Sequence, residues 1–373
     1  MTSPGRAILA LFALALSGRG GEGAVADDFE RLTTEAEEAS QAKRFNDAID
    51  RYGKALELKP EWLEGRFSLG SLLYQVDDYA GARTQFGRIV ASDPTNALAF
   101  ALRGLCEVQL SAYESALADL EKAHGLGMGN EQVAMVAGYQ YATLLTRFER
   151  YDAAQDLLKE FALQGQEGLP LIEAFGLALL RLPYLPSEAP PARREMILLA
   201  GRAAYYMARG MRTDTARFAQ EELRSRYPED PNVRYAYGTF LLADEPDAAL
   251  AEFERVLELS PGYYHARIQI ALELMERGQP EDALPYARQA MEAAPTYFAA
   301  RLVHGRALLE TGDLTQAIPE LERSVDLAPT ARKGYLYLAR AYQRAGRDAD
   351  AERIRTEFAE LEKQANPRQT DEP

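Results

Sequence analysis

Apolar and small residues in the C-terminal part of the chain recur with a period of 34 residues. The register is marked by Ala249, Ala283, Ala317 and Ala351 and by Pro261, Pro295 and Pro329. Inside each period, apolar residues recur every three or four positions on both sides of a short turn, which is the spacing of one face of an α-helix. The pattern predicts a pair of helices repeated along the chain, as in repeat proteins.

The copy that ends at Pro329 shows how one pair is built. Gly305 lies in the first predicted helix, and Ala317 opens the second helix twelve residues later, after a turn at Gly312 and Asp313. We expect the two small residues where the helices cross, because a larger side chain there would hold the backbones apart. Proline stops the second helix. One pair cannot bury its own apolar face, so neighbouring pairs must stack.

The same plan extends toward the N-terminus through residues 29–164 as four further pairs. Their second helices are marked by Ala48, Ala82, Ala116 and Ala154. The third pair ends in the glycine-rich run 125–129 instead of a proline. This run follows a predicted helix, whereas a dinucleotide-binding loop follows a strand, so it is interpreted as a helix end and turn.

The register breaks after residue 165. A short apolar helix is predicted at 171–182, and the proline-rich segment 183–191 cannot continue a helix and should form an extended crossover. Residues 193–209 and 213–227 are predicted to form a fifth pair, followed by four more. The expected parts are an N-terminal array at 27–165, an irregular helix and crossover at 166–195, a C-terminal array with a capping helix at 196–364, and a disordered tail at 365–373.

Taken together, the features of the repeat resemble the tetratricopeptide repeat. These are a small residue with Leu and Gly in the first helix, a Gly-Asp turn, Ala and an aromatic residue in the second helix, and a closing Pro. The resemblance covers most of residues 29–362. It implies an all-α fold, a right-handed superhelical solenoid of about nine helix hairpins, whose first helices line a concave groove that binds peptides or proteins. It implies no catalysis, and a fold alone does not determine function.

Residues 1–26 do not follow the repeat and have the character of a signal peptide. Arg6 precedes an apolar run at 7–16, and Ala24 and Ala26 are the small residues that a signal peptidase requires. The run is too short to span a bilayer comfortably. We therefore expect export to the periplasm or the extracellular space and no membrane span in the mature protein. A cleavage site nearer Ser17 is an alternative.

Composition and motifs argue against an enzyme. The chain has 373 residues and a net charge of −15, which disfavours nucleic acid or an anionic membrane as the partner. Its histidines, His124, His265 and His304, lie in different repeats without the neighbouring His or Cys that a zinc site needs. No catalytic motif occurs, and the single cysteine, Cys106, is expected to be buried. We predict no catalytic residue, metal or cofactor.

Tyrosine and arginine gather at the positions that the resemblance assigns to the groove. The candidate groove residues are Tyr139, Arg147, Arg202, Tyr205, Arg209, Tyr235, His265, Gln269, Arg306, Tyr337, Arg340 and Arg344. Because arginine binds carboxylates and tyrosine offers flat apolar area, they favour an acidic, extended segment as ligand. The alternative is that several of these arginines pair with neighbours such as Glu276 and Glu310 and contribute only to solubility.

These observations together favour a non-catalytic adaptor or assembly factor that binds a protein or peptide in its groove. A scaffold or targeting subunit of a cell-envelope enzyme complex is the main alternative. A groove for a small anionic ligand is a weaker one.

The predicted helix crossing can be tested directly. Replacing Ala317 by Leu should lower the free energy of unfolding of the C-terminal part by about 1–3 kcal/mol, because the added side chain overpacks the crossing with Gly305. Chemical denaturation measures the loss. Wild-type stability in this variant would show that the register is wrong.

Overall fold

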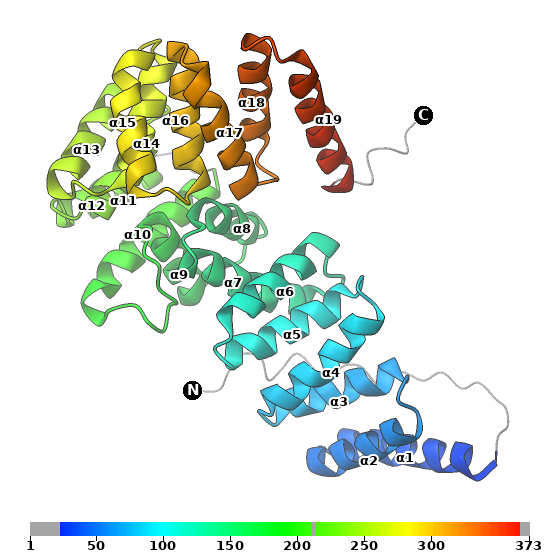
Figure 1. Cartoon of the computed structure of the whole chain (residues 1–373). Helices are drawn as coiled ribbons and strands as arrows, with labels where there is room; N and C mark the ends of the chain where they lie inside the picture. Colours follow the sequence, from blue (N-terminus) through cyan, green and yellow to red (C-terminus); the bar gives the residue numbers. More distant parts are fainter. Residues whose placement is uncertain (1–22, 211–213, 366–373) are drawn as a thin grey trace. The chain divides into compact units, whose positions relative to one another are not determined.

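The computed structural model describes residues 23–210 and 214–365, and throughout these residues the chain is helical, without a β-strand (Figure 1). The all-α prediction is confirmed. Most of the predicted signal peptide (1–22) and most of the predicted tail (366–373) lie outside the described residues. Contacts between Cα atoms divide the chain into unit 1, residues 1–213, and unit 2, residues 214–373.

Unit 1 consists of successive antiparallel helices. They are α1 (Gly23–Gln41), α2 (Phe45–Leu58), α3 (Leu63–Gln75), α4 (Tyr79–Ser92), α5 (Ala97–Gln109), α6 (Tyr113–Leu126), α7 (Glu131–Arg147), α8 (Tyr151–Leu163), α9 (Leu169–Leu179) and α10 (Arg194–Ala208), with the 3-10 turn η2 (Pro191–Arg193) before α10. They pack in consecutive pairs, α1 with α2 through α9 with α10.

Unit 2 repeats the arrangement. Its helices are α11 (Asp214–Arg226), α12 (Pro231–Leu241), α13 (Pro246–Leu259), α14 (Tyr264–Glu276), α15 (Pro280–Ala293), α16 (Phe298–Thr311), α17 (Leu314–Leu327), α18 (Arg332–Arg344) and α19 (Asp348–Ala365). The pairs begin with α12 and α13, and α11 packs on α12 ahead of them.

Each pair crosses where the first helix has a small residue, as the period of 34 predicts. A Cβ atom added to Gly305 would lie 2.7 Å from Leu321 Cγ, and one added to Gly104 would lie 2.9 Å from Leu120 Cγ. Ala317 is fully buried beside this contact. A Cβ atom essentially never comes that close to another carbon, so each crossing depends on the absence of a side chain.

The predicted fifth pair, 193–209 with 213–227, is wrong. Its two helices, α10 and α11, belong to different units, and α10 instead pairs with α9. A Cβ atom on Gly176 or on Gly201 would lie 1.9 Å from a carbonyl oxygen of the other helix, that of Ile197 or Ile172. The two glycines bring the backbones of α9 and α10 together across the proline-rich segment, a contact that a fixed sequence period could not reveal.

The proline-rich segment forms no α-helix, as predicted, but it packs against the rest of unit 1. Leu182 and Leu185 are buried. The Glu188 carboxylate accepts a hydrogen bond from the Leu185 N–H across 3.1 Å and pairs with Arg147 across 3.2 Å. The segment is therefore an ordered connection within unit 1.

An arginine in the first helix of several pairs joins that pair to the preceding one. Arg66, Arg234 and Arg301 each donate to the carbonyl oxygen of a proline six residues earlier, Pro60, Pro228 or Pro295, across 2.5–3.0 Å. Each also donates to a side chain in the second helix of its own pair, Gln85, Glu252 or Glu320, across 2.7–3.2 Å. We call this arrangement the arginine bracket. It satisfies a carbonyl group at the helix junction and links three successive helices.

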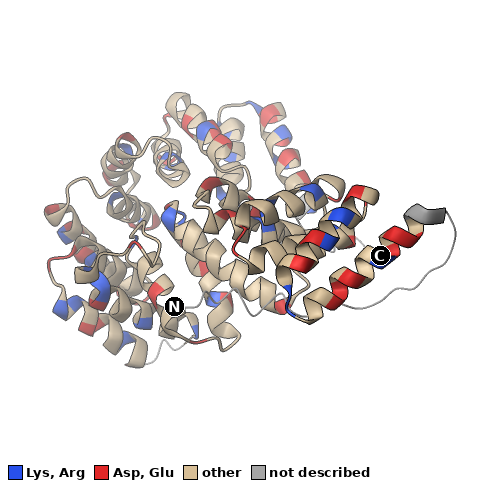
Figure 2. Cartoon of the chain, turned by 90° about the horizontal axis from the view of Figure 1, so that it is seen from below, with Lys and Arg blue, Asp and Glu red and all other residues tan. Residues whose placement is uncertain are grey.

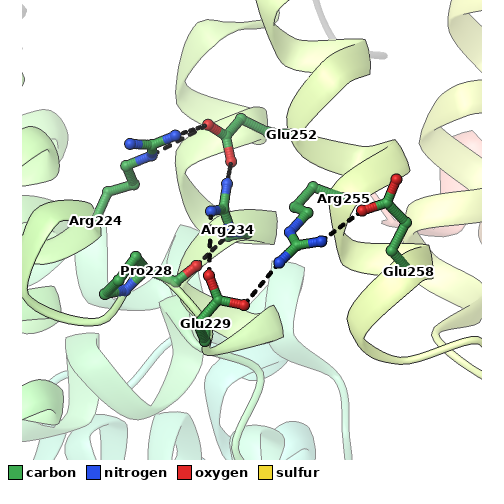
Figure 3. Close-up of polar contacts among 7 residues, drawn as sticks. All are labelled: Arg224, Pro228, Glu229, Arg234, Glu252, Arg255 and Glu258. Atoms are coloured by element: carbon green, nitrogen blue, oxygen red, sulfur yellow. Dashed lines mark hydrogen bonds and ion pairs between the residues drawn. The ribbon is translucent and has the colours of Figure 1, made fainter.

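The bracket of Arg234 carries the most charge (Figure 3). The side chains of Arg234 and Glu252 are 11% and 10% exposed and lie 2.7 Å apart. Arg224 of α11 reaches the other carboxylate oxygen of Glu252 at 2.9 Å. Arg255 extends the network at the surface, because it pairs with Glu229 across 2.8 Å. Glu252 thus ties α11 and α12 to α13.

Removing the central carboxylate should be costly. Glu252→Ala removes the close, buried counterion of Arg234 and leaves it only the exposed Glu229 at 3.9 Å, so we expect unit 2 to lose about 3 kcal/mol of unfolding free energy in urea denaturation. Glu258→Ala is the matched control, since Glu258 also pairs with an arginine of the network, Arg255, but is 64% exposed, and it should lose less than about 1 kcal/mol. Equal losses in the two variants would contradict the role of the bracket.

Candidate protein-binding surface

The first helices α12, α14, α16 and α18 of unit 2 carry the predicted groove residues from Tyr235 to Arg344. Side chains from neighbouring first helices touch one another. The Gln269 Nε2 of α14 donates to the Tyr235 hydroxyl of α12 across 3.3 Å. In α16, the Arg306 guanidinium lies 5.2 Å from the ring centroid of Tyr337 in α18. These helices therefore share one surface, which we call the first-helix surface.

Two of the predicted groove residues lie mostly beneath this surface. Tyr235 is 2% exposed and His265 is 8% exposed. The Tyr235 ring packs 5.6 Å from that of Phe253, 5.4 Å from that of Tyr263 and 6.0 Å from that of His265. Tyr235 and His265 therefore support the surface and offer little area to a partner.

The charge of Arg306 is largely neutralised within the protein. Its side chain is 13% exposed and pairs with Glu276 and with Glu310, each across 2.9 Å. Burial lowers the pKa of the Arg306 guanidinium, but the hydrogen bonds that it donates to these two carboxylates outweigh this effect, and the net pKa is raised. Internal pairing, the alternative left open by the sequence, therefore describes Arg306.

The charges of α18 are not neutralised in this way. Figure 2 shows acidic and basic residues interspersed along most helices, whereas α18 has four basic residues and no acidic one. Arg332, Lys333 and Arg340 are exposed, and within the described residues none of them forms an ion pair. Arg344 donates to the carbonyl oxygen of Leu309 instead of a carboxylate. The outer face of α18 is therefore a basic surface whose charge is not balanced by a carboxylate of the described residues.

Apolar area lies between these charges. Leu336 is 50% exposed although it is a large aliphatic residue. Tyr337 is half-buried, and the Arg340 guanidinium lies 5.8 Å from its ring centroid, on an aromatic side chain that Arg306 also contacts. Spacing of four residues places Arg332, Leu336, Arg340 and Arg344 along one stripe. The stripe offers carboxylate-binding groups beside an apolar contact.

The remaining candidates belong to unit 1. Burial raises the pKa of the half-buried Tyr139 to about 12, with a further contribution from Glu173. Arg147 pairs with Glu188, and the buried Tyr205 donates to Glu167 across 3.0 Å while accepting from Arg209. Arg202 is exposed and forms no ion pair with the described residues.

Comparison with known protein families matches the chain to the model described as tetratricopeptide repeat. It matches residues 67–131, 268–332 and 302–354, which lie in both units. The matched segments are tetratricopeptide repeats. The resemblance recognised in the sequence is thus confirmed.

No curated protein sequence matches the chain. Among solved structures it is similar to MamA of Desulfovibrio magneticus RS-1, with 26% identity over 48% of this chain and 98% of that one and a TM-score of 0.40. Yeast Tom70 has 14% identity over 91% and 93% of the two chains, with a TM-score of 0.33. The Cut9–Hcn1 hetero-tetramer of APC/C has 17% identity over 90% and 67%, with a TM-score of 0.38.

The described repeats offer little for chemistry. In residues 23–210 and 214–365 there is no cluster of three or more His, Cys, Asp or Glu side chains suited to a metal ion. Burial raises the pKa of the Cys106 thiol to about 12, so it stays protonated at neutral pH. None of the helices in the same residues has both the length and the apolar character needed to cross a membrane. Tetratricopeptide repeats generally serve protein interaction and not catalysis.

Sequence reasoning missed three members of the basic surface, Arg332, Lys333 and Leu336. A signal was present, because residues 327–347 of this repeat protein contain five basic residues and no acidic one. The exposure of Leu336 could not be predicted from the sequence, since the helical pattern alone does not show which neighbours cover a residue.

Proposed function

We propose that this protein is a non-catalytic adaptor or assembly factor that binds an acidic, extended segment of a partner protein on its first-helix surface. The observation that carries the proposal is the outer face of α18, where Arg332, Lys333 and Arg340 are exposed and have no carboxylate partner among the described residues. A carboxylate that binds there does not compete with an acid of the protein itself. Such cations attract an acidic partner and orient it on approach.

The arrangement favours a protein segment over a small anion. Leu336 and Tyr337 lie between the cations and would contact apolar side chains of the partner. Arginine would form charge-assisted hydrogen bonds with its carboxylates. A small anion would leave this apolar area uncovered. Of the candidates in unit 2, Arg340 and Arg344 are assigned to ligand contact, and Arg306 is assigned to holding Tyr337 in place.

A scaffold or targeting subunit of a cell-envelope enzyme complex would use the same surface to hold the enzyme. The two functions differ in the identity of the partner and not in the way it is bound. Isolation of the protein from its host together with its partner separates them, since a co-purifying enzyme favours the scaffold.

We also propose that the protein is exported, because residues 7–16 form an apolar run after Arg6 and Ala26 follows at a suitable distance. Cleavage after Ala26 would remove the first residues of α1, which begins at Gly23, and leave the rest of the helix. N-terminal sequencing of the protein from its host tests this. A mature chain that still begins at residue 1 would contradict the proposal.

The binding proposal predicts a specific effect of charge reversal. The probe is a labelled 12-residue peptide of Glu and Leu, compared with the same peptide in which Gln replaces Glu. The double variant Lys333→Glu with Arg340→Glu should weaken binding of the Glu peptide about tenfold, or about 1.4 kcal/mol, as expected for the loss and reversal of two exposed contacts. Fluorescence anisotropy at several salt concentrations measures it, and the affinity should fall as salt rises.

Arg288→Glu is the control, because Arg288 is an exposed arginine on α15, a second helix of the same unit, that forms no ion pair with the described residues. It should leave the affinity nearly unchanged. Equal binding of the Glu and Gln peptides, or full affinity in the double variant, would exclude the α18 surface.

A further inference from the structure

A pocket of about 450 Å³ opens in unit 1 between the end of α6, the N-terminal half of α7 and α8. Its apolar lining comes from Met128, Ala134, Met135, Leu157 and Phe161. Met135 is 40% exposed, although Met is usually buried. A volume of this size is in the range of ligand-binding pockets and has room for an aromatic side chain.

The pocket lies where the arginine bracket has been replaced. The bracket arginine stands four residues before the small crossing residue, as Arg301 does before Gly305. The crossing residue of α7 is Ala142, twelve residues before Ala154, so Gly138 occupies the arginine position. No side chain extends from it toward the junction.

The other two parts of the bracket are replaced as well. Its acceptor stands three residues after the alanine of the second helix, as Glu320 does after Ala317, and at this junction that position is Leu157. The proline of the bracket stands six residues before the arginine, and at this junction that position is Gln132, inside α7. Gly138 and Leu157 line the pocket. At this junction an open apolar cavity thus stands in place of the arginine bracket that closes several other junctions.

Charge at the rim indicates what could enter. Glu131 of α7 and Glu160 of α8 line the pocket and are exposed, and neither forms an ion pair with the described residues. Neither Lys nor Arg is among the residues that line it. A ligand that fills the apolar interior and meets both carboxylates must be apolar at its centre and positively charged on its flanks.

We propose that this pocket is a second protein-binding site, which takes a bulky apolar side chain from a basic segment of a partner protein. The apolar side chain lies against Phe161 and the two methionines, whose flexible side chains adapt to its shape. Lysine or arginine on either side of it pairs with Glu131 and Glu160. The site is separate from the basic face of α18, so it selects a partner segment of opposite charge.

The probe is a 12-residue peptide of Lys, Gly and Ser with one central Phe, compared with the same peptide carrying Ala in place of Phe. With the methionine methyl groups labelled by carbon-13, NMR should show the Met128 and Met135 resonances shifting to saturation with the Phe peptide. The Ala peptide should bind at least tenfold more weakly, because the loss of the ring leaves the pocket empty.

Two variants test the same site in the full chain. Glu131→Lys with Glu160→Lys should weaken the Phe peptide at least tenfold, and Ala134→Phe, which fills the pocket with a side chain of its own, should do the same at unchanged helicity. Glu114→Lys is the matched control, since Glu114 is an exposed glutamate in the first turn of α6 as Glu131 is in α7, and it should bind as the wild type does.

Several results would overturn the proposal. They are no binding of the Phe peptide, equal binding of the Phe and Ala peptides, shifts at methionines outside the pocket only, or full affinity in Ala134→Phe. Lys333→Glu with Arg340→Glu should leave this binding intact, so failure here is distinguishable from failure of the α18 surface.

Discussion

Close approach of two helix backbones is the constraint on which every repeat of this protein depends. Gly104 and Gly305 have no room for a Cβ atom, and the Gly176 and Gly201 backbones each touch a carbonyl group of the facing helix. Once a pair is this close, its apolar stripe faces the neighbouring pair and is buried by stacking. A side chain at the crossing would therefore disturb both its own pair and the packing of the next.

Stacking leaves the polar groups at each helix junction to be satisfied, and the arginine bracket does this at several junctions. Arg66, Arg234 and Arg301 each bind a proline carbonyl group and a side chain of their own second helix. The partly buried charge of Arg234 is balanced by Glu252. The bracket uses positive charge inside the array, whereas Arg332, Lys333 and Arg340 of α18 are exposed and form no ion pair with the described residues.

Variation between repeats therefore has a physical meaning. Where the bracket is present, the junction is closed by charge-assisted hydrogen bonds. Where Gly138 and Leu157 replace it, a pocket remains that is apolar inside and acidic at its rim. On α18 the exposed Arg332, Lys333 and Arg340 form no ion pair with the described residues. The two units thus present surfaces of opposite character, and one chain could hold two different partner segments.

The sequence by itself determined the helices, their pairing in most repeats and the residues at the crossings. These features depend on local periodicity and on side-chain size, which are both visible along the chain. It also predicted that Tyr337, Arg340 and Arg344 share one face of their helix, because the repeat register assigns all three to groove positions.

Only the tertiary structure decided which charges are free. Arg306 is neutralised by Glu276, thirty residues away, whereas Arg340 is not neutralised, although both are arginines at groove positions of the repeat. It also decided that α10 pairs with α9, and that the replaced bracket at Gly138 leaves a cavity. The physical reason is the same in each case. The distance between two side chains on different helices depends on how closely those helices cross. The period of the sequence does not specify how closely they cross.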